Sequence, residues 1–213
     1  MLVDVAFSDA RHGWIVGEYG TILATTDGGA TWKTQRPKAQ GAASIQAVAF
    51  TDAFHGWALA GTTILSTSDG GATWNTRTLE ASAYLYELTF ADSTHGWVVG
   101  GWGTILATAD GGVTWTAQSA GTGEDLYAVS FVDATHGWAV GLSGYICATT
   151  NGGATWRRQK TGITSRLTDV ACSDAKHGWA VGSGNVILAT KTGGMLPAKS
   201  SLSARWLLIA HRR

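Results

Sequence analysis

The chain has 213 residues, and its 15 lysines and arginines balance its 15 aspartates and glutamates, so the formal net charge is zero. Proteins that bind nucleic acid or anionic lipid usually carry a basic surplus, so neither partner is expected. Hydrophobic residues make up 45 % of the chain and charged residues 14 %, which excludes a disordered protein. The 29 glycines and 11 tryptophans favour turn-rich β structure. No apolar run approaches the roughly 20 residues of a membrane span.

The chain is built from internal repeats. The triplet His-Gly-Trp occurs five times, and each triplet is followed by a second motif that reads TTDGGATW at 25–32 in its first copy. The fifth copy of this motif, at 190–197, has lost its Asp, Thr and Trp. The predicted repeats span about 1–42, 43–82, 83–123, 124–164 and 165–194.

Each repeat contains four short strand-like segments. In the first repeat they are residues 2–7, 13–17, 21–26 and 31–35, separated by turn residues. Four antiparallel strands per repeat of about 40 residues are typical of a β-propeller blade. We therefore predict an all-β propeller domain over 1–194 with five four-stranded blades, either complete or part of a six- or seven-bladed ring. Residues 195–213 fit no repeat, and the segment 203–210 is a candidate closing strand.

The two repeated motifs are expected to be structural turns. In the DGG motif, called an Asp box, the acidic side chain accepts hydrogen bonds from its own turn, the glycines allow positive φ, and the tryptophan is predicted to be a buried plate between neighbouring sheets. The predicted Asp-box residues are Asp27, Asp69, Asp110 and Asn151 with Trp32, Trp74, Trp115 and Trp156. The predicted residues of the His-Gly-Trp turn are His12, His55, His95, His136 and His177.

The repeat, read as L-x-D-V-A-F-x-D-A-x-H-G-W-x-V-G-x-x-G-x-I-L-x-T-x-D-G-G-x-T-W, resembles the photosystem II stability/assembly factor family of Asp-box propellers. The resemblance covers residues 2 to about 194. It implies a scaffold that binds a photosystem II subunit, or another extracytoplasmic protein in a host without photosynthesis. It also favours the periplasm, the thylakoid lumen or secretion, although residues 1–10 do not read as a signal peptide. Family propellers typically have seven blades, and this chain shows five.

Catalytic and metal chemistry find little support in the sequence. The five repeat histidines occupy equivalent turns of different blades and would not converge on a metal, and no cofactor motif is present. The arginine triad and Tyr–Glu pair of sialidases cannot be matched. The alternative, a glycoside hydrolase of the Asp-box group, would use carboxylates at one position of the innermost strands, namely Asp4, Glu87 and Asp169.

The second hairpin of each repeat and the connection to the next repeat differ from blade to blade, so we expect a protein partner to bind there. An exposed tryptophan at a hairpin tip would be a binding anchor, with local packing as the alternative role. Basic connections would flank it. The predicted partner-binding residues are Tyr19, Trp102, Arg36, Lys38, Arg157, Arg158 and Arg166. Together these observations predict a non-catalytic, monomeric binding scaffold.

Overall fold

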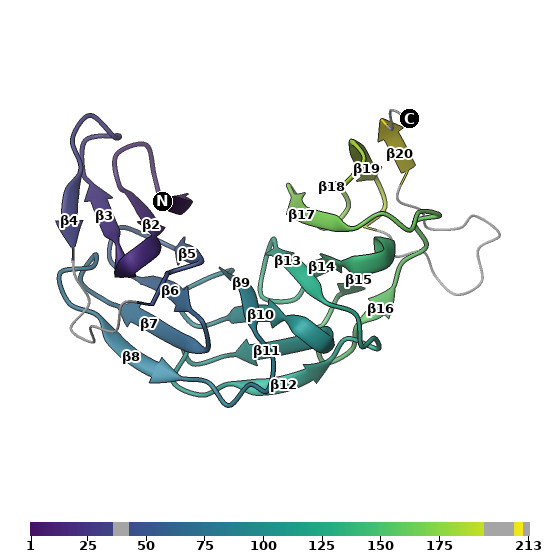
Figure 1. The fold of residues 1–213 in the computed structure, drawn as a ribbon, viewed down its shortest axis with the longest axis horizontal. Coiled ribbons are helices and arrows are strands. Elements are labelled where there is room, and N and C mark those ends of the chain that lie inside the picture. Colours follow the sequence, from purple (N-terminus) through teal and green to yellow (C-terminus); the bar gives the residue numbers. More distant parts are fainter. Residues whose placement is uncertain (36–42, 194–206, 211–213) are drawn as a thin grey trace. The chain divides into compact units, whose positions relative to one another are not determined.

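A computed structural model describes residues 1–35 and 43–193, together with the backbone of 207–210. It confirms the predicted fold class, because these residues form five four-stranded antiparallel sheets, the blades of a β-propeller (Figure 1). The strands, in chain order and blade by blade, are β1 (Leu2–Phe7), β2 (Gly13–Gly17), β3 (Ile22–Thr25) and β4 (Lys33–Gln35); β5 (Ala47–Phe50), β6 (Gly56–Ala60), β7 (Thr63–Thr67) and β8 (Asn75–Thr78); β9 (Leu85–Phe90), β10 (Gly96–Gly100), β11 (Thr104–Thr108) and β12 (Thr116–Ser119); β13 (Leu126–Phe131), β14 (Gly137–Gly141), β15 (Ile146–Thr149) and β16 (Arg157–Arg158); β17 (Leu167–Cys172), β18 (Gly178–Gly182), β19 (Val186–Thr190) and β20 (Leu207–Ala210).

Every blade has the same topology. Its four strands pair in the order of the sequence, each antiparallel to the next. In blade 5 the fourth strand comes from the segment after the repeats, since β20 pairs with β19 and places Leu208 opposite Leu188. Short 3-10 turns lie in the second hairpin of three blades: η1 (Glu18–Gly20), η2 (Gly101–Gly103) and η3 (Leu142–Gly144).

The chain divides into two compact units. The first comprises residues 1–96 and 108–115, and therefore contains blades 1 and 2 with β9 and the Asp box of blade 3. The second comprises residues 97–107 and 116–213, which include the remaining strands of blade 3 with blades 4 and 5. Each unit has its own apolar core.

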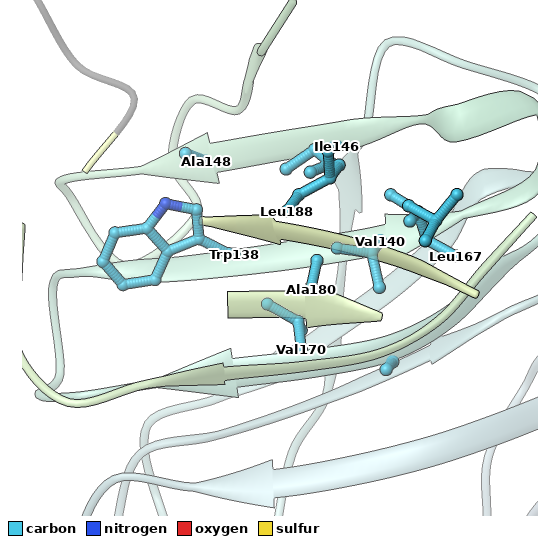
Figure 2. Packing of buried hydrophobic residues seen from close by; sticks show 10 residues of the cluster. Trp138, Val140, Ile146, Ala148, Leu167, Val170, Ala180 and Leu188 are labelled. Carbon is cyan, nitrogen blue, oxygen red and sulfur yellow. The ribbon is translucent and has the colours of Figure 1, made fainter. Parts of the chain in front are cut away.

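The core of each unit lies between adjacent blades. In the first unit, Trp14, Val16 and Ile22 of blade 1 pack with Ile45 and Val48 of blade 2. In the second unit the equivalent residues of blades 4 and 5 repeat this packing (Figure 2), and they are Trp138, Val140, Ile146, Leu167 and Val170. Side chains alternate between the two faces along each strand, and the inner strands carry apolar residues on both faces, so a blade with a neighbour on each side can contact both.

The His-Gly-Trp triplet joins one blade to the next. Trp14 of blade 1 lies parallel to Phe50 of blade 2, with ring centroids 3.4 Å apart. Its indole Nε1 donates to the carbonyl of Gly70 in the Asp box of blade 2, at 3.1 Å. The glycine before the tryptophan is needed because a Cβ at Gly13 would collide with the ring of Phe7 on the paired strand. Trp57 and Trp97 make the same stacking contact and the same hydrogen bond to the blades that follow them.

Candidate functional site

Each blade has two different ends. The repeat-turn end carries the His-Gly-Trp turn and the Asp box, and the variable-loop end carries the second hairpin and the connection to the next blade. Antiparallel strands place successive hairpins at alternating ends, so the two repeated motifs share one end of a blade. The functional residues predicted from the sequence divide between these two ends.

The Asp box is a closed hydrogen-bonded turn, as the sequence predicts. In blade 1, the amide and hydroxyl of Thr31 donate to the Asp27 carboxylate at 2.8 and 2.6 Å. The Thr25 hydroxyl donates to the same carboxylate at 2.7 Å. These donors, Thr31 first, lower the pKa of Asp27 to about 2. The two box glycines have φ of +71° and +89°, a region that glycine enters at little cost.

The His-Gly-Trp turn is closed by a second carboxylate. Asp9 accepts the amide hydrogens of Arg11 and His12 at 2.7 and 2.9 Å, and the ring Nδ1 of His12 lies 2.8 Å from its other oxygen. The amide of Arg11, followed by that of His12, lowers the pKa of Asp9 to about 2. The same pairing recurs at His55, His95, His136 and His177. The ring of each repeat histidine thus contacts the aspartate of its own turn.

The expected role of the box tryptophans needs correction. Among them only Trp74 is buried, whereas Trp32, Trp115 and Trp156 are partly exposed. Each box tryptophan meets the phenylalanine of its own blade edge-on, with interplanar angles of 84 to 88°. The flat plate between blades is instead the tryptophan of the His-Gly-Trp triplet. It occupies this position because it stands on the second strand, within the sheet, whereas the box tryptophan stands at the start of the outer strand.

Two of the three candidate catalytic carboxylates, those of Asp4 and Asp169, accept hydrogen bonds from backbone amides. The Asp4 carboxylate accepts the amide hydrogens of Val5 and Val48, both at 2.8 Å, so it links blade 1 to blade 2. Asp169 accepts the amide hydrogen of Val170 at 2.7 Å. Within the described part of the chain, no group of three or more His, Cys, Asp and Glu residues could hold a metal ion.

The two cysteines have unreactive thiols. Burial raises the pKa of both Cys147 and Cys172 to about 12, and neither forms a disulfide. Because the thiolate is the nucleophile, these side chains act as small apolar residues.

At the variable-loop ends, the tip of the second hairpin has a left-handed backbone. Tyr19, Trp102 and Ser143 have φ between 55 and 58°, and Gly184 takes this position in blade 5 with φ of 75°. The shorter hairpin of blade 2 has Gly61 with φ of 63°. Glycine and asparagine adopt this conformation readily, whereas a bulky side chain pays about 1 to 2 kcal/mol. Trp102 is nevertheless 70 % exposed, and Tyr19 is exposed as well.

Two pairs of contacting residues lie at the variable-loop end between blades 3, 4 and 5. The backbone N–H of Trp102 donates to the carboxylate of Asp125 at 3.0 Å, so the connection from blade 3 to blade 4 fixes the tip. Arg166, in the connection from blade 4 to blade 5, places its guanidinium 5.4 Å from the ring centre of Tyr127. We call Trp102, Asp125, Tyr127 and Arg166 the loop-end cluster. It combines an exposed aromatic side chain with an acidic group and a basic group.

The other predicted basic residues have separate environments. Arg158 lies over the ring of Tyr145 at 5.2 Å, and Arg157 is exposed on the outer strand beside it. Arg36 and Lys38 fall outside the described residues. Tyr19 belongs to the first unit, where its neighbour Glu18 pairs with the amino group of Met1 at 2.6 Å.

The sequence prediction missed most of the tyrosines. The chain has five, and all of them lie in or beside the second hairpins and connections: Tyr19, Tyr84, Tyr86, Tyr127 and Tyr145. Tyrosine suits sites where one end of the side chain is apolar and the other is wet. This segregation from the tryptophans of the repeat turns was a visible signal. It would have pointed to Tyr127 as a neighbour of the basic connections.

The sheets, triplets and boxes define an Asp-box β-propeller with a constant and a variable end. A family model, described as photosynthesis system II assembly factor YCF48, matches residues 1–46 and 78–160. The chain therefore belongs to the YCF48 family of photosystem II assembly factors, as the repeat pattern predicts.

Curated relatives match over a short segment. The photosystem II assembly lipoprotein Ycf48 of Parasynechococcus marenigrum (strain WH8102) is 60 % identical over 30 residues, and the photosystem II assembly protein Ycf48 of Thermosynechococcus vestitus (strain NIES-2133 / IAM M-273 / BP-1) is 47 % identical over 32 residues. These segments are 14 % and 15 % of this chain and 9 % of each relative.

Solved structures show the same fold over a longer span. YCF48 from Cyanidioschyzon merolae has a TM-score of 0.73 and 21 % identity, over 97 % of this chain and 71 % of that one. A structure of YCF48 bound to a D1 peptide has a TM-score of 0.51 and 19 % identity, over 98 % of this chain and 82 % of that one. An ancestral GH74 enzyme, at 15 % identity, has a TM-score of 0.74 over 98 % of this chain and 31 % of its own. These likenesses are below 25 % identity and establish the fold alone.

Proposed function

We propose that this protein is a non-catalytic scaffold that captures a polypeptide segment at the variable-loop ends of its blades, with the loop-end cluster as the main contact. By family membership the partner would be a photosystem II subunit. In one of the similar solved structures YCF48 is bound to a D1 peptide, which makes a D1 peptide the natural first probe.

The observation that carries this proposal is the side chain at the hairpin tip. The turn needs a left-handed residue. Blade 5 has Gly184 at the position of Trp102, and the shorter hairpin of blade 2 has Gly61. Blade 3 instead holds Trp102 there, exposed to solvent and strained. Neither backbone preference nor burial accounts for a tryptophan at this point. Strained backbone and exposed aromatic side chains both favour a binding role.

The surrounding charges suit an extended polypeptide. Arg166 can donate to a carboxylate or a main-chain carbonyl, and its guanidinium is held against Tyr127. Asp125 fixes the backbone of Trp102, so the aromatic anchor does not lose much freedom on binding. Acidic and basic residues on neighbouring connections favour a protein partner over nucleic acid, which requires a continuous basic track.

A catalytic role has less support. The carboxylates that the glycosidase alternative requires include Asp4 and Asp169, and both accept hydrogen bonds from strand amides. A carboxylate engaged in this way is poorly placed to transfer a proton to a sugar. We therefore assign these residues to the architecture of the blades.

Binding of a labelled D1 peptide, followed by fluorescence anisotropy, tests the proposal. Trp102→Gly is expected to weaken binding about thirtyfold, the equivalent of roughly 2 kcal/mol for an anchor residue. The same change relieves the left-handed strain, so the variant should be at least as stable as the parent. The matched control is Phe54→Ala, which removes an exposed aromatic side chain at a repeat-turn end. Unchanged affinity for Trp102→Gly, or an equal loss for Phe54→Ala, would overturn the proposal.

A further inference from the structure

One sheet face of blade 1 and one sheet face of blade 5 are exposed, whereas the equivalent faces of other blades are covered by an adjacent blade. On blade 5, Trp179, Val181 and Ile187 are 37 to 45 % exposed. Their counterparts in blade 1 (Trp14, Val16 and Ile22) and in blade 4 (Trp138, Val140 and Ile146) are at most 2 % exposed. Those counterparts are covered by the blade that follows. We call these three residues of blade 5 the leading face.

Blade 1 carries the opposite half of the same interface. Leu2, Val5 and Phe7 are 47 to 55 % exposed. In blades 2 and 5 the preceding blade covers the residues equivalent to Leu2 and Val5, which are at most 6 % exposed. They are Ile45 and Val48 in blade 2, and Leu167 and Val170 in blade 5. At the position of Phe7, Phe50 of blade 2 packs against the same core. We call Leu2, Val5 and Phe7 the trailing face.

The two faces carry matching chemistry. At the first three joints between blades, the triplet tryptophan stacks on the phenylalanine of the next blade and donates its Nε1 hydrogen to the first glycine carbonyl of that blade's Asp box. Trp179 is a triplet tryptophan, Phe7 is the phenylalanine, and Gly28 is the first glycine of the box in blade 1. A leading face meeting a trailing face would therefore reproduce a joint that the chain already forms.

We propose that the leading face of one copy of this chain binds the trailing face of a second copy, so that the chains associate head to tail. Apolar patches of this kind mark interaction sites, and repeat proteins whose end repeats lack a polar outer face tend to associate. The contact is heterologous, since each copy uses a different face, and one free face of each kind remains after every addition. This departs from the monomer expected from the sequence, a prediction that the structure leaves untested.

Sedimentation velocity of the 213-residue chain over a range of concentrations tests this. The parent chain should form species at multiples of 22.2 kDa whose proportion rises with concentration. Val5→Glu and Trp179→Glu, which place a charge at positions already exposed, should each give only the single-chain mass. An equimolar mixture of the two variants should restore association but stop at two copies, because each variant retains one intact face. This restoration also shows that both variants are folded.

Phe54→Ala is the matched control, since it removes an exposed aromatic side chain outside both faces, and it should associate like the parent. Three results would overturn the proposal. One is a parent chain that stays at the single-chain mass at every concentration. The same result would be obtained if the two faces bound each other within one chain, and it would overturn the proposal in that case too. The second is association of Val5→Glu on its own, which would mean that like faces pair. The third is a mixture of the two variants that does not associate.

Discussion

The repeat-turn ends and the variable-loop ends are joined by the same strands but differ in what recurs from blade to blade. At the repeat-turn ends, one set of bonds recurs: a threonine and a carboxylate close the Asp box in blades 1, 2 and 3, and an asparagine replaces the carboxylate in blade 4. At the variable-loop ends the backbone conformation recurs, but the side chains do not. Repetition at one end holds the blades together, and this rigidity leaves the other end free to differ.

The sharpest contrast lies between two tryptophans five residues apart in blade 3. Trp97 is buried, stacks on Phe131 and donates to the carbonyl of Gly152, whereas Trp102 is exposed at the hairpin tip. Replacing Trp97 by alanine should lower the free energy of unfolding by about 3 to 5 kcal/mol, because it leaves a cavity and an unpaired carbonyl. Replacing Trp102 by alanine should change it by less than about 0.5 kcal/mol. Urea unfolding of both variants measures the difference, and similar losses would contradict the division between the ends.

Acid should destabilise the fold by protonating the carboxylates of the repeat-turn ends. The pKa values of Asp9, Asp27, Asp69, Asp110 and Asp174 are lowered from 3.8 to about 2 in the folded protein. A lowered pKa gives stability that is present above the unfolded value, near pH 4, and is lost as the pH falls towards 2. The midpoint of thermal unfolding should therefore drop between pH 4 and pH 2.

The control for this prediction copies blade 4, where Asn151 forms the box without a titrating group. A chain with Asp27→Asn, Asp69→Asn and Asp110→Asn should lose less stability over the same pH range than the parent. A parent chain with a constant unfolding midpoint from pH 5 to pH 2, or an identical fall in the triple variant, would show that these carboxylates are not the source of acid sensitivity.

A smaller effect is expected from one structural residue at the variable-loop ends. Tyr145 is buried, and its hydroxyl donates to the carbonyl of Ala120 at 2.6 Å. Tyr145→Phe should lower the free energy of unfolding by about 1 kcal/mol, because it leaves that carbonyl without its donor. Tyr19→Phe, at an exposed hairpin tip, is the matched control and should have no measurable effect. Equal unfolding midpoints for the two variants in urea would count against the role assigned to Tyr145.

Most of the architecture could be predicted from the sequence because the same strand and turn pattern occurs in five repeats. The four strands per repeat and the Asp27 turn both follow from local spacing. The choice between Trp14 and Trp32 as the plate between blades did not, since both are tryptophans beside a turn and only the packing of neighbouring sheets distinguishes them. The contact of Arg166 with Tyr127 was equally inaccessible, because these residues are far apart in the chain and are brought together by the stacking of blades.

Family membership and the fold support a binding scaffold, and the proposed contact is the loop-end cluster. No helix within the described residues is long and apolar enough to cross a membrane. Trp102, Asp125, Tyr127 and Arg166 all belong to the second compact unit. A peptide that binds this cluster should therefore slow amide exchange in the second unit more than in the first.

Hydrogen–deuterium exchange of the chain with and without a D1 peptide is the most direct test of binding at the variable-loop ends. The account predicts that the peptide slows exchange in residues 101–103, 122–127 and 159–166, while the Asp boxes at 27–31 and 110–114 exchange as before. Slowed exchange confined to the Asp boxes, or no change anywhere, would contradict it.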